Sequence, residues 1–377
     1  MAAIRAIGMV SSLGLDWRTA CAAARAGLRR AAPVEGLETS SEVDGEDEQT
    51  IGHAVTLLTH GFEGGARLLR LLAGGLQDLL LQAPQLRIAD AGVGYFLVLP
   101  PRDRVRSSPA LGAAVMDDVS APHPDADAEA PAPPDFEFDR SRLLACAAEL
   151  AGIEGVPLLS GVWEDDDVSA LVALDGAARL LDAGNLRGAV VLAVDSLLSA
   201  EVVEWLEQTS RLKSSGMPVG LEPGEACVAL WLDNAAAPGV TISGTSFAIE
   251  PQALADATTS TGDGTARTLL ALAERFGLAQ RPALWLLSDH NGEPYRANDL
   301  ALAIVRARTT CPAFGAATVS YPALSFGDVG VARPLVAVCL AVAAFERGWA
   351  PAGECVVLAV GTSRRRAALL IAPTTAH

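Results

Sequence analysis

Four consecutive carboxylates form the densest group of reactive side chains in the sequence. They run from Glu164 to Asp167 in the segment GVWEDDDVSALVAL (161–174), directly before a stretch with the pattern of a buried helix. Neighbouring carboxylates can act on a substrate as general acid and base. Carboxylates in the first turn of a helix are also stabilised by its free N–H groups and its dipole, by about 0.3–1 kcal/mol each. The sequence favours a helix cap and leaves a functional acid as the alternative.

Three further sets of residues could take part in chemistry. Ser169, at the expected helix start, would be a nucleophile only with a base nearby, and the sequence places none there. His290, in ALWLLSDHNGEPYR, is interpreted as a loop residue, with catalysis as the alternative. The run Arg364, Arg365 and Arg366 either binds an anionic partner or is solvated.

The sequence predicts neither a cofactor nor a metal. Its six cysteines are scattered without CxxC spacing, and no His, Cys and Asp residues have the spacing of metal ligands. It contains no P-loop and no dinucleotide-binding fingerprint. Scattered cysteines are typical of a reduced, cytoplasmic setting.

Charge and hydropathy argue against nucleic acid and membranes as partners. Among 377 residues, 45 are acidic and 28 are basic, and the net charge of −17 repels nucleic acid and anionic lipid. The apolar stretch at 331–345 contains an Arg and a Pro and is shorter than the roughly 18 residues of a membrane span. The first residues lack the pattern of a signal peptide. We therefore expect a cytoplasmic protein without membrane insertion.

Strand and helix patterns alternate along the chain and would position these residues. Asp16 is the expected N-cap of the first helix. The expected strands are 3–10, 94–99, 156–160, 188–196, 225–233, 239–247, 283–289, 355–361 and 366–373. The expected helices are 17–28, 61–82, 140–152, 168–183, 199–208, 264–277, 297–307 and 331–346. Apolar strands alternating with helices indicate parallel-rich sheets covered on both faces.

The order of the elements starts again after residue 237. It predicts an α/β protein of two related halves, residues 1–237 and 238–377. Two stretches of the first half, 34–60 and 100–138, are expected to be loop excursions, because they are rich in acidic and turn-forming residues or in Pro and Ala. Their acidic parts, 34–50 and 118–138, are candidate partner surfaces.

Four segments in this order resemble the β-ketoacyl synthases of the thiolase superfamily. They are IRAIGMVSSLGLDWRTACAAARAG (4–27), VSALVALDGAARLLDAGNLRGAVVLAVDS (168–196), GLEPGEACVALWLD (220–233) and SFGDVGVARPLVAVCLAVAAFERGWAP (325–351). The resemblance implies a thiolase-like fold with a duplicated, five-layer αβαβα architecture, usually dimeric. It also implies acyl transfer of the 3-oxoacyl-ACP synthase class, which uses a cysteine thiolate and two histidines.

The position of the family's cysteine is occupied by an aspartate. The family motif runs roughly C-S-S-S-L-V-A-L, with a glycine seventeen residues after the cysteine. Residues 168–174 fill that register without a gap, and Gly184 falls where the glycine is expected. Asp167 therefore takes the nucleophile position. An aspartate can act as a base but cannot form a thioester.

The remaining machinery of the family is also altered. In the motif H-G-T-G-T, pairing the glycine puts Asn291 at the first histidine, and a shift of one residue would restore His290. In the segment of the motif G-H-T-x-G-A-A-G, Ser325 or Phe326 replaces the second histidine, and the lysine before it is absent. Arg364 to Arg366 stand where small residues normally approach the acyl site.

These losses predict a pseudoenzyme that acts through protein–protein contacts. The resemblance offers two versions. One is a subunit like the chain length factors, which pair with an active ketosynthase; the other is an accessory protein of bacterial type VI secretion, which the short GLEPGEA and SFGDVG turns resemble more closely. A homodimer is a further expectation. The alternative is an acyltransferase with rearranged chemistry, in which Asp167 and His290 together act as the general base.

Overall fold

The structure is a computed structural model and describes residues 2–40, 47–102, 104, 140–234, 239–254 and 259–374. Most of the expected excursion 100–138, and the expected boundary between residues 237 and 238, lie outside the described residues. None of the described helices is long and apolar enough to span a membrane.

Ten strands form one continuous sheet in the order β10-β9-β11-β12-β8-β1-β7-β6-β4-β5. The strands of the first half are β1 (Ala3–Ser11), β4 (Val93–Val98), β5 (Leu158–Trp163), β6 (Gly188–Ser196) and β7 (Glu225–Asp233). Those of the second half are β8 (Val240–Ile249), β9 (Trp285–Leu287), β10 (Thr318–Ser320), β11 (Cys355–Val360) and β12 (Arg365–Pro373).

The two sets of five strands have the same topology. In each set the first strand pairs antiparallel with the fifth, and the fifth pairs antiparallel with the fourth. The fourth pairs parallel with the second, and the second pairs parallel with the third. The sets join through β1 and β8, where Ala3 lies opposite Thr241 and Ile4 opposite Val240. The sequence predicted mainly parallel sheets, and this prediction is wrong, because half of the strand pairings within each set are antiparallel.

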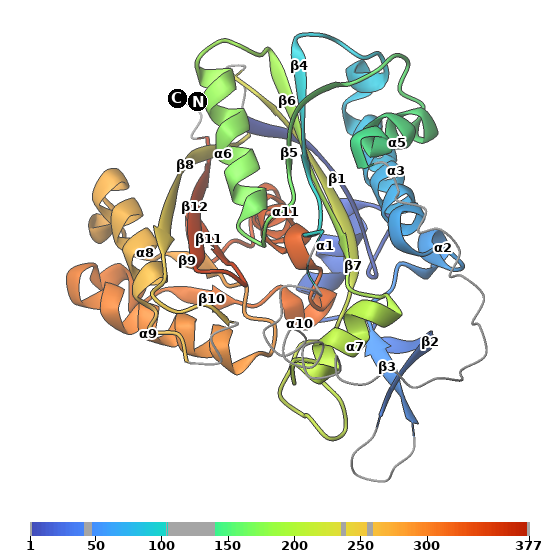
Figure 1. The fold of residues 1–377 in the computed structure, drawn as a ribbon. Helices are drawn as coiled ribbons and strands as arrows, with labels where there is room; N and C mark the ends of the chain where they lie inside the picture. The colour runs from blue at the N-terminus through green and yellow to red at the C-terminus, as the bar shows by residue number, and fades with distance from the viewer. Residues whose placement is uncertain are drawn as a thin grey trace, which may run out of the picture.

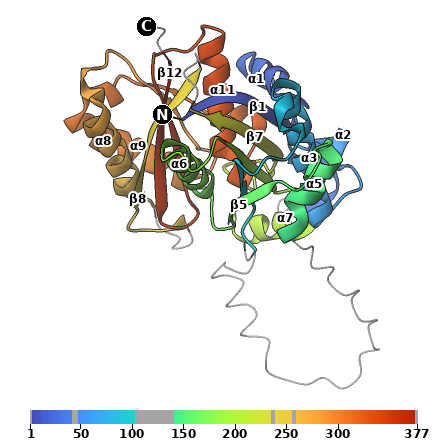
Figure 2. The same ribbon diagram turned by 90° about the horizontal axis from the view of Figure 1, so that it is seen from above.

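Helices cover both faces of each set and also lie between the sets, which gives five layers (Figures 1 and 2). The outer helices of the first half are α3 (Gly64–Gln82) and α5 (Leu143–Ala151), and those of the second half are α8 (Asp263–Phe276) and α9 (Pro294–Thr310). The central layer holds α1 (Trp17–Arg25), α6 (Ser169–Asp182) and α11 (Arg333–Glu346). Separate apolar cores fill the outer and central spaces. The architecture is therefore the αβαβα arrangement that the resemblance implied.

The buried elements follow the apolar patterns of the sequence. Strands β6 and β7 have the predicted bounds, and eight of the nine residues of each are buried. Helix α11 has apolar residues on all sides, as a helix of a central layer requires, and all but its last two residues are buried. Asp16 caps α1, because its Oδ1 accepts the N–H of Thr19 at 2.8 Å.

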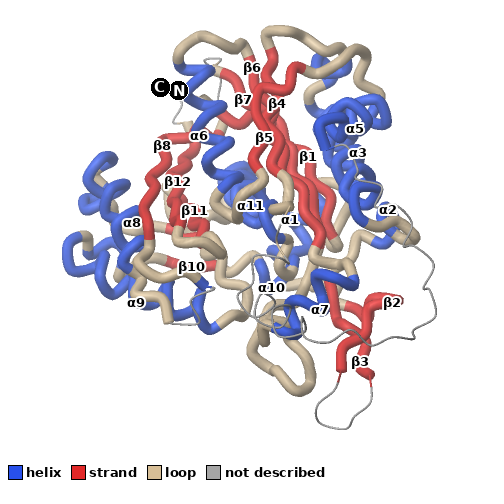
Figure 3. The backbone as a smooth tube through the Cα atoms, in the orientation of Figure 1, coloured by secondary structure: helices blue, strands red, loops and turns tan. Residues whose placement is uncertain are grey.

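The stretch 34–60 differs from the expected loop. It contains most of an antiparallel hairpin, β2 (Ala32–Ser40) and β3 (Asp47–Gly52), and a short helix, α2 (Thr56–Thr59). The hairpin stands apart from the large sheet (Figure 3). In β2, Leu37 and Thr39 are buried and Glu38 between them is exposed. Because only one of the two buried residues is apolar, the sequence shows little of the alternation that predicts a strand. The remaining helices are α7 (Ala200–Gln208) and α10 (Ala323–Phe326).

Candidate functional site

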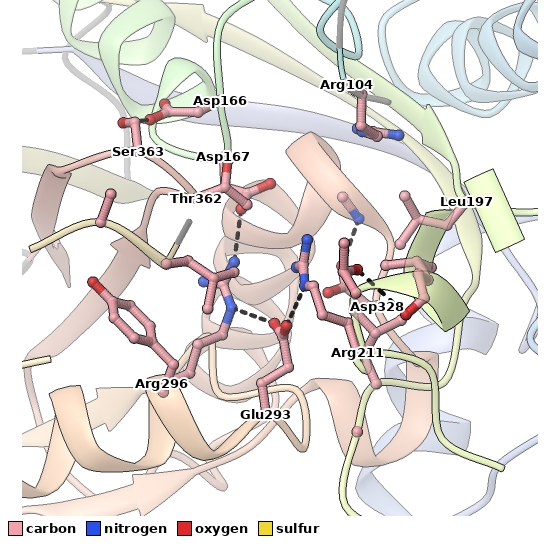
Figure 4. Close-up of a pocket in the computed structure, with 18 of the residues that line it drawn as sticks. Arg104, Asp166, Asp167, Leu197, Arg211, Glu293, Arg296, Asp328, Thr362 and Ser363 are labelled. Atoms are coloured by element: carbon pink, nitrogen blue, oxygen red, sulfur yellow. Dashed lines mark hydrogen bonds and ion pairs between the residues drawn. The ribbon is translucent and has the colours of Figure 1, made fainter. Parts of the chain in front are cut away.

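A cavity of about 1110 Å³ lies where both halves of the chain contribute loops and helix ends (Figure 4). Its lining comes from the acidic segment before α6, from the end of α7, from the start of α9, and from the segments before α11 and between β11 and β12. Glu164 to Asp167 all contact it. These four carboxylates thus face a space large enough for a ligand.

The four carboxylates have different partners. Glu164 accepts from Arg102 at 2.5 Å, and the exposed Asp165 pairs with Arg365 at 2.9 Å. Asp166 accepts the N–H of Val168 at 3.0 Å and a hydrogen bond from the Ser363 hydroxyl. Helix α6 has Val168 at its N-cap, without a side-chain cap hydrogen bond, and its first turn contains no acidic residue, so the helix-cap interpretation is wrong. Asp166 instead accepts a hydrogen bond within the turn that precedes the helix.

Asp167 forms two buried ion pairs. Its Oδ2 lies 2.8 Å from Nη2 of Arg296 and 2.5 Å from Nη2 of Arg333. Only 9% of the Asp167 side chain is exposed. Burial raises the pKa of this carboxyl, but Arg333, Arg296 and Arg104 together hold it below its ordinary value. Asp167 is therefore an ionised counter-ion for two guanidinium groups.

The same arginines bind further carboxylates. Arg296 also pairs with Asp289 at 2.9 Å and with Glu293 at 3.1 Å. Arg333 pairs with Asp328 at 3.0 Å. These side chains are all buried. The site is thus a connected network in which positive and negative charges alternate, and it joins the starts of α6, α9 and α11.

Asn291 connects to this network through its amide. Its Nδ2 donates to Oδ2 of Asp328 and to Oε2 of Glu293, the latter at 2.8 Å. A continuous path therefore runs from Asp167 through Arg333 and Asp328 to Asn291. The sequence predicts Asp167 at the family's cysteine position and either Asn291 or His290 at its first histidine.

Two arginines complete the cavity from the first half of the chain. Arg211 donates from Nε to Glu293 Oε1 at 2.5 Å, and its guanidinium lies over the ring of Trp205. Arg104 donates to both carboxylate oxygens of Asp195. In Figure 4, Glu293 lies between Arg296 and Arg211, with Asp167 and Asp328 on opposite sides of the space.

His290 lies beside the network rather than in the cavity lining. Its ring meets that of Tyr321 edge-on, with the centroids 5.9 Å apart. Burial and the nearby charge of Arg296 lower the pKa of His290, although Glu293 opposes them. Among the described residues, no hydrogen bond or ion pair joins the side chains of His290 and Asp167.

The two serine candidates are also outside the lining. Ser169 is fully buried, and its Oγ accepts the N–H of Asp166 at 3.2 Å rather than contacting a base. Ser325 is half-buried in α10. From this segment Asp328 enters the network instead.

The three arginines between β11 and the body of β12 have separate roles. Arg366 is fully buried, binds Asp299 at 3.1 Å and donates to the Tyr295 hydroxyl at 2.6 Å. Arg365 lines the cavity. Arg364 is exposed, and its carbonyl accepts the N–H of Glu250 at 2.7 Å. The run therefore does not act as one patch.

The sequence did not predict four arginines of the site: Arg104, Arg211, Arg296 and Arg333. A partial signal exists for Arg333, a lone charge at the start of the apolar helix RPLVAVCLAV. A buried charge needs a buried partner, so an arginine in such a pattern predicts a carboxylate nearby. The identity of that carboxylate depends on contacts between distant segments.

None of the six cysteines lines the cavity. Burial raises the pKa of Cys21 to about 12, with Asp16 and Asp78 adding to the effect, and burial also raises the pKa values of Cys227, Cys339 and Cys355. Nor do any three His, Cys, Asp or Glu residues in the described ranges form a group that could hold a metal ion.

Comparisons with known proteins identify the fold. Neither a protein-family model nor a curated protein matches the chain. A chain of the ishigamide ketosynthase/chain length factor matches with a TM-score of 0.65 and 19% identity, over 99% of each chain. A chain of the ketosynthase ApeO with its chain length factor ApeC, from Xenorhabdus doucetiae, matches with a TM-score of 0.68 and 14% identity, over 99% of this chain and 98% of that one.

A third match is a type II polyketide synthase ketosynthase bound to a hexaketide, in complex with its acyl-carrier protein. The TM-score is 0.70 and the identity is 12%, over 98% of each chain. The repeated five-strand topology, the five layers and these matches over nearly the whole length agree with one another. The chain has the thiolase-like fold found in ketosynthases and chain length factors.

Proposed function

We propose that this protein is a cytoplasmic, non-catalytic ketosynthase-like protein that acts through contacts with another protein. The observation that carries the proposal is the state of Asp167, at the position of the family's nucleophile. Its carboxylate is ionised and buried and is bound by Arg296 and Arg333. Acyl transfer to it would break both ion pairs and leave each of two buried guanidiniums with one counter-ion fewer, at a cost of several kcal/mol. The acyl anhydride formed would also hydrolyse quickly.

The edge strand β5 supports the second part of the proposal. It pairs with β4 and stands at the end of the sheet, so its other edge has no strand partner among the described residues. Leu158 is 45% exposed and Val162 is 43% exposed, and Leu159 beside them is exposed as well. An unpaired edge with exposed apolar side chains favours pairing with another chain. We propose this edge as the contact surface.

Two assemblies are candidates, each for its own reason. Pairing with an active ketosynthase is supported by the match to chains of two structures that contain a ketosynthase and a chain length factor. A role as an accessory of bacterial type VI secretion is supported by the short turns GLEPGEA and SFGDVG of the sequence. A homodimer through β5 is compatible with either role, because an edge strand can pair with its own copy.

The alternative function is an acyltransferase with rearranged chemistry. It requires the side chains of Asp167 and His290 to lie together at the bound substrate, or a general base within hydrogen-bond distance of the Ser169 hydroxyl. His290 instead contacts Tyr321, and Ser169 is enclosed at the start of α6. These positions favour the non-catalytic proposal.

Acyl transfer is tested by incubating the protein with acyl coenzyme A and with an acyl-carrier protein charged with an acyl group. Intact mass spectrometry detects a covalent adduct, and a thiol assay detects free coenzyme A, which also reports an adduct that hydrolyses. We expect no adduct and no thiol release above the buffer rate. A stable adduct, mapped by peptide sequencing to Asp167, Ser169 or another residue, would overturn the proposal in favour of an acyltransferase.

The partner is tested by affinity purification from the native lysate. Recovery of a ketosynthase subunit would support the first assembly, and recovery of a secretion protein would support the second. Charge introduced at β5 by Val162→Lys should abolish the recovery of either. Recovery unchanged by this substitution would contradict β5 as the contact surface.

A further inference from the structure

The cavity has the size and walls of a ligand site. Its volume, about 1110 Å³, is slightly above the roughly 300–1,000 Å³ of typical small-molecule pockets. Leu206, Leu221 and Leu254 provide apolar wall, and Trp205 adds an aromatic surface. The charged network occupies another part of the lining. A molecule that fits must therefore have a polar end and an apolar end.

Asp167 presents an acceptor to this space. Both of its ion pairs use Oδ2. Oδ1 accepts none of the hydrogen bonds found among the described residues, although the side chain is more than nine-tenths buried and lines the cavity. A carboxylate oxygen accepts about two hydrogen bonds when it is satisfied. A hydrogen-bond donor of a ligand would satisfy Oδ1.

Arg211 presents donors from another side. Its Nε is bound to Glu293, while its two terminal nitrogens take part in none of the hydrogen bonds found in the described part of the chain. The guanidinium carbon lies 4.9 Å from the centroid of the Trp205 ring, which leaves the edge of the group for a planar acceptor. A carboxylate suits that edge, because guanidinium and carboxylate form two parallel hydrogen bonds.

The surrounding charges disfavour a simple ion. A simple anion would meet the carboxylates of Asp167, Glu293 and Asp328. A simple cation would meet the guanidiniums of Arg104, Arg296 and Arg333. A molecule that carries an acceptor and a donor at separate atoms can place each group against the matching side chain.

We propose that the cavity binds a small carboxylic acid that also carries a hydrogen-bond donor, either an ammonium or a hydroxyl group. Its carboxylate binds the free edge of Arg211, its donor binds Oδ1 of Asp167, and its apolar side chain packs on the leucines of the wall. Binding breaks no covalent bond, so this function is independent of acyl transfer and of contacts at β5.

Isothermal titration calorimetry of the full chain with four matched probes tests this proposal. L-Leucine and 2-hydroxy-4-methylpentanoate carry a carboxylate and a donor; 4-methylpentanoate lacks the donor, and 3-methylbutylamine lacks the carboxylate. We expect at least one of the first two to bind about tenfold more tightly than both of the others. The better of those two identifies the donor as ammonium or hydroxyl. The proposal would be overturned if a probe that lacks one group bound as tightly as the probes that carry both. It would also be overturned if none of the four probes bound at millimolar concentration.

Two variants locate the binding. Val219→Trp fills the cavity from its rim, where Val219 is 55% exposed, without touching the charged network. It should abolish binding while the melting temperature stays unchanged. Leu57→Trp, at a residue of α2 that is 81% exposed and outside the lining, is the control and should bind as the wild type does. Wild-type binding by Val219→Trp would show that the probe binds elsewhere and would contradict the site.

Discussion

At Asp167, a short acidic side chain is held by two long basic ones that come from the other half of the fold. Arg296 and Arg333 are 129 and 166 positions away in the sequence, so no local pattern predicts them as partners. The register of the motif predicts that Asp167 occupies the nucleophile position. It could not predict that this residue would be a counter-ion, because that depends on which distant charges the fold buries beside it.

The first prediction concerns the stability provided by this pairing. Asp167→Asn removes the negative charge and leaves Arg296 and Arg333 buried with fewer counter-ions. We expect the free energy of unfolding to decrease by about 3–5 kcal/mol. Urea unfolding followed by circular dichroism measures this change.

Asp165→Asn is the matched control, two residues away in the same acidic segment. The Asp165 side chain is 65% exposed and pairs with Arg365 near the surface. Its loss should change the free energy of unfolding by less than about 1 kcal/mol. Equal effects of the two substitutions would mean that burial of the charges at Asp167 does not stabilise the fold.

At the scale of elements, the bounds of a strand could be predicted where both faces of the strand are buried. The central strands β6 and β7 are continuous apolar runs, so their bounds follow from the sequence. The hairpin of β2 and β3 was missed because it has few apolar residues, and two of its buried residues are the polar Thr39 and Thr50. Strand β10 has three residues and is too short to show a period. The elements that the sequence did not predict are therefore those with weak or short patterns of apolar residues. The class of fold did not depend on them.

The second prediction concerns the packing of α3 against β1. Asp78 of α3 accepts the backbone N–H groups of Met9 and Trp17, each at 2.9 Å. Burial raises the pKa of Asp78 from its ordinary 3.8 to about 6, although these hydrogen bonds lower it in part. Between these two pH values the folded state keeps a proton that the unfolded state has lost. This carboxyl therefore contributes a stability that is full below 3.8 and decreases as the pH rises to about 6.

Asp78→Asn should flatten that decrease, because the amide does not ionise and its oxygen can still accept a hydrogen bond. The free energy of unfolding measured from pH 4 to pH 7 checks this. Asp263→Asn, in an exposed pair with Arg267, is the control and should follow the pH dependence of the wild type. A decrease as steep in Asp78→Asn as in the wild type would assign the pH dependence to other groups.

At the scale of the whole molecule, the repeated topology leaves β5 at one end of the sheet and β10 at the other. The two ends differ in their side chains. Strand β5 exposes Leu158, Leu159 and Val162, whereas the residues of β10 are Thr318, Val319 and Ser320. If association involves a sheet edge, apolar burial favours the β5 edge.

The third prediction is that association depends on β5. Val162→Lys should shift the protein, alone or with its partner, towards the monomer in sedimentation equilibrium, because a charge would be buried at the contact. Leu57→Lys places the same charge on α2, where the residue is 81% exposed, and should leave association unchanged. Equal effects of the two substitutions would contradict a specific contact at β5.

We propose that Asp167 stands at the position of the nucleophile of this fold, and one comparison tests this proposal most directly. Wild type and Asp167→Cys are incubated with hexanoyl coenzyme A, and the intact mass of each is measured. In the variant, Arg296 and Arg333 would lie beside the new thiol and lower its pKa, so the thiolate would be available to attack the thioester. We predict that the variant gains one hexanoyl group at residue 167 and that the wild type gains none. A hexanoyl adduct on the wild type, or a folded variant that stays unmodified, would contradict the account.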